Sequence, residues 1–142
     1  MTDPVALSTF LLVFVTFIGL LIGIRTYRRQ TNAQVFLEYT KRYENIMESF
    51  PTNALPARLA LEGTPPPQST ELSLALLRYL NLSSEEFYLQ SKGYLAKEIW
   101  LIWEGELTRT LRSPLMRREW KELRSEFDSY PEFLTYVDST LE

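Results

Sequence analysis

The sequence predicts an all-α protein in which one N-terminal transmembrane helix is followed by a cytoplasmic bundle of four to five helices. The stretch from Pro4 to Ile24 contains no charged residue, and three arginines follow it closely. Beyond this stretch, apolar residues recur at intervals of three and four, while sustained period-two alternation and Asn-Gly or Asp-Gly turns are absent. We therefore divide the chain into an anchor, residues 1–24, and a helical domain, residues 25–142.

The apolar stretch is long enough to cross a bilayer, because a helix rises about 1.5 Å per residue and the hydrocarbon core is about 30 Å thick. Its Val, Leu, Ile and Phe residues each favour membrane insertion by about 0.3 to 0.6 kcal/mol. A cleaved signal peptide carries its positive charge before the apolar run and ends in small residues. Here Asp3 precedes the run and the arginines follow it. The stretch is therefore interpreted as an anchor rather than a signal peptide or a buried helix.

The charges around the span predict its orientation, because basic residues that flank a span tend to stay in the cytoplasm. We expect a single-pass protein with its N-terminus outside and its C-terminal domain in the cytoplasm. The absence of cysteine fits a cytosolic domain. Membrane lipids are expected partners, since basic side chains attract anionic headgroups and an aromatic ring suits the interface. The residues predicted to contact headgroups are Arg25, Tyr27, Arg28 and Arg29.

The predicted span has two different faces. At about 100° per residue, Phe10, Phe14, Phe17 and Leu21 fall on one side. Small residues on the opposite side allow a second helix to approach closely. This pattern predicts contact with another copy of the chain or with a partner membrane helix, the alternative being a monomeric anchor. The predicted helix-contact residues are Ser8, Thr9, Thr16, Gly19 and Gly23.

The first cytosolic helix is expected from about Arg25 to Ser49 and can be continuous with the span, since Pro51 ends it. A loop is expected over about residues 51–69, with a short helical turn between residues 53 and 62. The second helix is capped by Ser69 or Thr70 and runs to about Ser91. A capping-box pattern at residues 83–86 leaves open a restart within it.

Three further helices complete the bundle. The third is predicted over Tyr94 to Leu111, after Gly93, and Tyr94 is a candidate for the buried side of the bundle. The fourth begins at the Ser113-Pro114 corner, because serine caps helices and proline suits the first helical position. The last short helix begins near Pro131.

No residue pattern points to catalysis. The chain has no histidine and no cysteine, so the commonest metal ligands, the usual general base near neutral pH and the thiolate nucleophile are missing. Its few glycines form no phosphate-binding loop. The carboxylate pairs Glu44/Glu48 and Glu104/Glu106 are interpreted as solvated helix faces. We expect no enzyme, no cofactor, no metal and no small-molecule substrate.

A basic cluster surrounds the Ser113-Pro114 corner and is a candidate surface for an acidic partner or an anion. Glu106, Glu119 and Glu122 are interleaved with it, which favours local ion pairs at helical spacing and makes nucleic acid an unexpected partner. The residues of this patch are Arg109, Arg112, Arg117, Arg118, Lys121 and Arg124.

Residues 77–127, with the Trp-x-x-Trp of Trp100 and Trp103 and the Arg-Ser-Pro corner, together with the span, resemble a bacterial family of single-span, all-helical membrane proteins of unknown function. The resemblance implies an inner (plasma) membrane location. A more distant likeness is to membrane accessory proteins of RNA-targeting CRISPR systems, whose relatives assemble into pores and carry a domain similar to HEPN ribonucleases. The HEPN motif pairs an arginine with a histidine, and neither Arg112 nor Arg118 has a histidine to pair with. That likeness therefore implies oligomeric assembly without ribonuclease activity.

Taken together, these features predict a non-catalytic interaction protein that self-associates or packs against partner membrane helices, acting as a scaffold at the cytoplasmic face. The first alternative is a monomeric adaptor or small subunit of a larger membrane complex. The second is an oligomeric pore-type accessory protein with an RNA-linked role.

Overall fold

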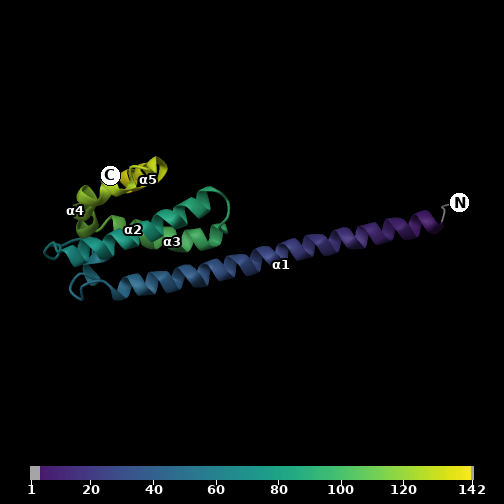
Figure 1. Ribbon diagram of the computed structural model, residues 1–142, viewed down its shortest axis with the longest axis horizontal. Coiled ribbons are helices and arrows are strands. Elements are labelled where there is room, and N and C mark those ends of the chain that lie inside the picture. The colour runs from purple at the N-terminus through teal and green to yellow at the C-terminus, as the bar shows by residue number, and fades with distance from the viewer. Residues whose placement is uncertain (1–3, 142) are drawn as a thin grey trace. The chain divides into compact units, whose positions relative to one another are not determined.

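The computed structural model describes residues 4–141, and all of its regular structure in this range is helical, which confirms the all-α prediction. Five α-helices and two short 3₁₀ helices follow one another along the chain (Figure 1). Their bounds are α1 Pro4–Glu48, η1 Pro56–Arg58, α2 Thr70–Ser91, α3 Lys97–Leu111, α4 Pro114–Leu123, η2 Arg124–Phe127 and α5 Pro131–Leu141.

The chain forms two compact units, Met1–Leu37 and Glu38–Glu142. The first unit contains the apolar part of α1. The second contains the last part of α1 and every later element, with α2 packed against α3 and α4, and α5 packed against α3. The sequence left open whether the predicted span continues into the next helix, and the structure shows that it does, since α1 is one unbroken helix.

The core of the second unit is built from the apolar stripes predicted for α2, α3, α4 and α5. Phe133 and Val137 of α5 and Leu107 of α3 are almost completely buried. The half-buried ring of Phe87 on α2 packs against several other rings, with centroid separations between 5.0 and 6.1 Å. These separations are typical of favourable aromatic pairs. The rings around Phe87 are those of Trp100, Tyr130, Phe133 and Tyr136.

The predicted caps at the start of α2 and α4 are confirmed. The Ser69 hydroxyl accepts a hydrogen bond from the backbone N–H of Leu72 at 3.2 Å. The Ser113 hydroxyl accepts one from the N–H of Met116 at 3.1 Å, and Pro114 follows at the first helical position. Each serine satisfies an N–H group that has no partner inside its own helix.

One helix boundary differs from expectation, and one alternative is settled. The third helix begins at Lys97 rather than Tyr94, because Gly93 has a φ of 71° that ends α2 and the chain stays extended at Ala96. Tyr94 is 68% exposed in this turn, so its assignment to the buried side is wrong, whereas the adjacent Leu95 is buried. The second helix runs without a break to Ser91, as expected, and the alternative of a restart at Ser83 is not realised, since the Ser83 side chain is buried on the continuous helix α2.

Candidate functional site

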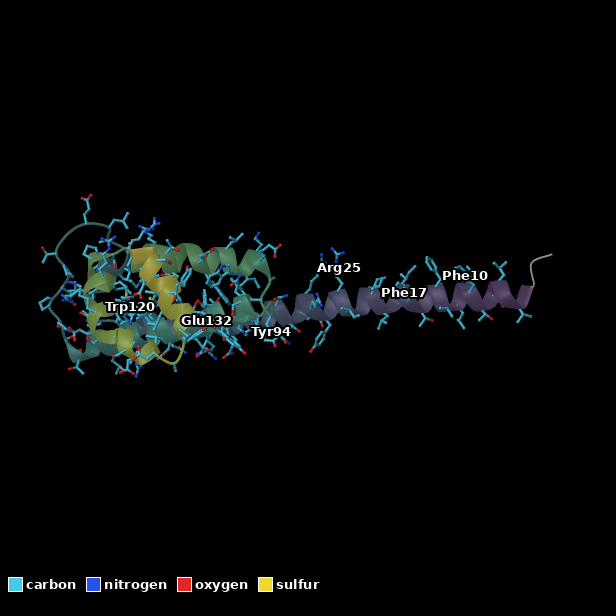
Figure 2. All side chains as sticks on the ribbon, turned by 90° about the horizontal axis from the view of Figure 1, so that it is seen from above. Phe10, Phe17, Arg25, Tyr94, Trp120 and Glu132 are labelled. Atoms are coloured by element: carbon cyan, nitrogen blue, oxygen red, sulfur yellow. The ribbon has the colours of Figure 1, made fainter. Side chains whose placement is uncertain are left out.

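The first part of α1 is long and apolar enough to cross a membrane, with a mean hydropathy of 2.6, and it is the one such helix in the part of the chain that the structure describes. None of it is buried by other parts of the chain. Phe10 and Phe17 project from this segment, and Arg25 lies beyond them along the helix (Figure 2). The apolar surface is therefore free to be covered by lipid or by other helices.

The hydroxyl groups on the small face of the span are bonded within their own helix. Ser8 and Thr9 both donate to the carbonyl of Val5 at 2.9 Å, and Thr16 donates to the carbonyl of Leu12 at 2.8 Å. Hydroxyl protons satisfied in this way carry a small penalty in an apolar surrounding. These residues can therefore face lipid or a second helix without exposing an unused donor.

The two glycines on this face have no role in the packing of their own unit. A Cβ atom added to Gly19 or Gly23 would meet nothing within 4 Å. Glycine inside a helix is less stable than alanine by about 1 kcal/mol. On the opposite face, the rings of Phe10 and Phe14 stack with their centroids 6.4 Å apart. The span thus has one flat face and one bulky face, in the arrangement that the periodicity predicts.

The residues predicted to contact lipid headgroups follow the apolar segment directly. Arg25, Tyr27, Arg28 and Arg29 are all exposed on α1, and the Tyr27 side chain is 69% exposed. Their positions allow the arginine stems to lie along an apolar surface while the charged groups remain in water.

The basic patch predicted around the Ser113-Pro114 corner is divided by the structure. Arg118 and Arg124 are held by acidic residues, so they are unsuited to bind an external anion. Arg118 pairs with the adjacent Glu119, and Arg124 pairs with Asp138 of α5. Neither pair has the spacing of three or four positions within one helix that the sequence predicted. The patch residues that remain exposed without a described ion pair are Arg109, Arg112, Arg117 and Lys121.

Arg118 and Glu119 fasten the long loop to the bundle. Glu119 is completely buried, and its carboxylate accepts hydrogen bonds from Arg118 at 2.7 and 2.9 Å and from the Ser73 hydroxyl at 2.8 Å. A terminal nitrogen of Arg118 also donates to the carbonyl of Pro66 at 2.6 Å. The buried Glu119 carboxylate thereby joins α4 to α2, and Arg118, which it holds in place, joins α4 to the proline-rich loop.

A second polar network, centred on Glu106, was not predicted from the sequence. The Arg58 guanidinium forms an ion pair with Glu106 and donates to Tyr43 at 2.9 Å and to Thr110 at 3.1 Å. The Tyr79 hydroxyl donates to the other Glu106 oxygen at 2.6 Å, and burial raises the pKa of Tyr79. Glu106 therefore belongs to a partly buried network and not to a solvated helix face.

A third cluster of charged residues lies where α1 meets α2. Arg42 donates two hydrogen bonds to Glu85, at 2.6 and 2.9 Å, and these bonds lower the pKa of Glu85. The neighbouring Glu86 is buried. Desolvation raises its pKa to about 8, so Glu86 is largely protonated at neutral pH.

A groove of about 700 Å³ follows the outer side of α2 and the start of α5. Aromatic residues share its lining with polar and charged ones, and Lys92 lies with its ammonium group 5.8 Å from the centre of the Tyr88 ring. Glu85 and Glu132 bring carboxylates of the opposite charge to the same groove. The aromatic lining residues are Tyr39, Phe87, Tyr88 and Tyr130.

The polar clusters around Glu106, Glu119 and Glu85 join separate elements of the bundle. Within residues 4–141, no group of three or more His, Cys, Asp or Glu side chains is arranged to hold a metal ion. Comparison of the chain with protein-family models, with curated proteins and with solved structures found no match.

Proposed function

We propose that this chain is a membrane-anchored, non-catalytic interaction protein that associates with further copies of itself through its span and acts as a scaffold at the cytoplasmic face. The observation that carries the proposal is the face of α1 that bears Gly19 and Gly23, over which the chain places no atoms of its own.

The cost of these glycines supports a contact outside the monomer. Each one lowers the stability of the helix relative to alanine, and the chain gains no packing or turn in return. In a bilayer, a flat surface of this kind lets a second backbone approach closely enough for extensive dispersion contact. Lipid chains pack against a glycine no better than against a leucine, so lipid alone does not favour this sequence.

We further propose that the span lies in the plasma membrane with the bundle in the cytoplasm. The basic residues at positions 25, 28 and 29 support this orientation through the positive-inside rule. A reporter fused after the last residue tests it directly: cytoplasmic activity is expected, and periplasmic activity would overturn the orientation.

The hydroxyl groups of the span favour a scaffold over a pore. Ser8, Thr9 and Thr16 each donate to a carbonyl of their own helix, so their protons do not provide hydrogen-bond donors for a water-filled channel. Apart from these residues the segment is apolar. Close contact between helices accounts for the same residues without a channel.

The proposal is tested by measuring the mass of the full-length protein in a mild detergent, together with a double substitution of Gly19→Leu and Gly23→Leu. A multiple of the protomer mass is expected for the native sequence, and the protomer mass for the double variant. The matched control is Phe10→Leu with Phe14→Leu, which changes the opposite face and is expected to leave the mass unchanged. A native mass equal to one protomer would instead favour a monomeric adaptor.

A further inference from the structure

The exposed face of α3 carries a pattern that is complementary to itself. Ile102 is 62% exposed, and Leu101 beside it is 55% exposed, although both are large apolar residues in a packed bundle. Glu98, Gly105 and Arg109 are also exposed on the same helix. The spacing of four, three and four positions from Glu98 to Ile102, Gly105 and Arg109 places all four on one face.

The glycine at the centre of this face has no explanation within the monomer. Gly105 lies in the middle of α3, and a Cβ atom added to it would meet nothing within 4 Å. Its φ does not require glycine, since the positive φ values in the described chain belong to Gly63 and Gly93. A helix-interior glycine costs about 1 kcal/mol relative to alanine. A hollow of this kind next to an exposed isoleucine suits a close-packed helix from outside.

The four residues are arranged symmetrically about the middle of the helix. When two copies of α3 run antiparallel, with the two-fold axis passing between positions 103 and 104, Ile102 of each copy lies over Gly105 of the other. In the same register Glu98 faces Arg109 at both ends. Neither Glu98 nor Arg109 makes a hydrogen bond or ion pair through its side chain within the described part of the chain, so both are available for such a pairing.

We propose that two copies of this chain pair through α3 in this antiparallel register, forming a second interface in addition to the one in the span. The proposal rests on the self-association in the proposed function and names the surface and register that extend it. An isologous pair of this kind is self-complementary, as two-fold symmetry requires. A parallel pair would place like charges together at both ends of the face, which is unfavourable.

Disulfide trapping in the full-length protein tests the register, because the chain contains no cysteine and an introduced thiol is unique. One copy carries Ile102→Cys and a differently tagged copy carries Gly105→Cys, and both are placed together in lipid vesicles. A disulfide requires the two Cα atoms to lie within about 7 Å. The mixed dimer is expected to form about tenfold faster than either symmetric dimer, since like positions are offset by about 4.5 Å along the paired helices. Faster formation of the symmetric dimer between two Ile102→Cys copies, or no trapped dimer, would overturn the proposal.

Charge reversal provides a second measurement that does not depend on folding, because both charged side chains are exposed. Glu98→Arg alone and Arg109→Glu alone are each expected to slow formation of the mixed disulfide about tenfold, since each substitution introduces two repulsive pairs. The combined exchange of both charges is expected to restore the native rate. The matched control is Arg78→Glu, which reverses one charge at an exposed position of α2, and it is expected to have no effect on this rate. Equal rates in all variants would contradict the register.

The two proposals fail in different ways. A glycine-dependent oligomer mass without α3 trapping would leave the span-mediated association in place and refute the α3 pair. A protomer mass in mild detergent, together with absent trapping in vesicles, would refute both.

Discussion

Arg58 and Glu106 form an ion pair that joins the loop after α1 to a helix 48 positions further along the chain. The Arg58 side chain is only 7% exposed, whereas the Glu106 side chain remains 33% exposed. Tyr43 and Tyr79 bond to the same carboxylate from two other helices. The pair therefore fixes the position of four elements relative to one another within the second compact unit, Glu38–Glu142.

Replacing Arg58 with methionine is expected to lower the free energy of unfolding by about 2 to 3 kcal/mol, because removal of one partner of a buried ion pair leaves the other charge uncompensated. The partial exposure of Glu106 places this value toward the low end for buried pairs. Chemical denaturation of the full-length protein in detergent, followed by tryptophan fluorescence, measures the change.

The control for this prediction is Arg78→Met, which removes an exposed arginine on α2 and is expected to change stability by less than about 0.5 kcal/mol. Equal effects of the two substitutions would show that the Glu106 network contributes little to stability.

The buried Glu86 predicts a pH dependence. Its pKa is raised to about 8 from an ordinary value of 4.5, so the folded protein holds a proton that the unfolded chain has released between these two values. The native state binds more protons, and stability therefore falls as the pH rises from about 4.5 to about 8, by at most about 1.4 kcal/mol per pH unit. Glu86→Gln should remove this slope and raise the melting temperature most clearly near pH 8. Thermal unfolding between about pH 5 and 8.5 measures both effects.

Glu85 lies on the same helix as Glu86, and its pKa is shifted in the opposite direction, so it provides a control. Hydrogen bonds from Arg42 lower its pKa, so its contribution is present above pH 4.5 and is lost as the pH falls through the folded value. Glu85→Gln should therefore lower the melting temperature at neutral pH and leave the alkaline slope unchanged. A wild-type melting temperature that does not fall between about pH 5 and 8 would contradict the role assigned to Glu86.

The helices of this protein could be predicted from the sequence because their signals are local. The apolar span, the caps at Ser69 and Ser113 and the proline at position 114 each act within one stretch of helix, and the structure contains all of them. The start of α3 was harder to predict, because Tyr94 continues the apolar periodicity. The positive φ of Gly93 and the burial of Leu95 override that pattern.

The polar networks could not be predicted, because they depend on contacts between residues far apart in sequence. Nothing near Glu106 indicates that Arg58 will reach it, and Glu106 has the spacing of an ordinary surface glutamate. Arg118 similarly belongs by sequence to a basic patch, whereas the structure directs it to Glu119 and to the carbonyl of Pro66. The one available signal was the presence of charged residues at positions within apolar stripes, which indicates buried pairs without identifying the partners.

Glu119 predicts a local effect on the loop that it helps to fasten. Its carboxylate is fully buried, so Glu119→Ala is expected to destabilise the protein by about 3 kcal/mol and to release Arg118 from its position beside Pro66. Limited proteolysis should then cut within residues 59–68 at protease concentrations that leave the native protein intact. Ser73→Ala removes a single hydrogen bond from the same carboxylate, and its cost should be nearer to about 1 kcal/mol without new cleavage. Cleavage at the same rate in the native protein and in Glu119→Ala would show that the loop is held by other contacts.

The two confirmed serine caps differ in burial, and this difference predicts unequal effects of the same substitution. Ser113 is completely buried and its bond to Met116 measures 3.1 Å, so in Ser113→Ala water cannot replace the lost acceptor for the Met116 N–H. Ser69 is exposed, and water can take over its role at the start of α2. We expect Ser113→Ala to cost about 2 kcal/mol and Ser69→Ala about 0.5 to 1 kcal/mol, the two ends of the range for such caps. Urea denaturation of both variants measures the two values. The two sites differ in whether water can reach the freed N–H group. An equal cost for both substitutions would therefore contradict the prediction that burial of the cap controls its contribution to stability.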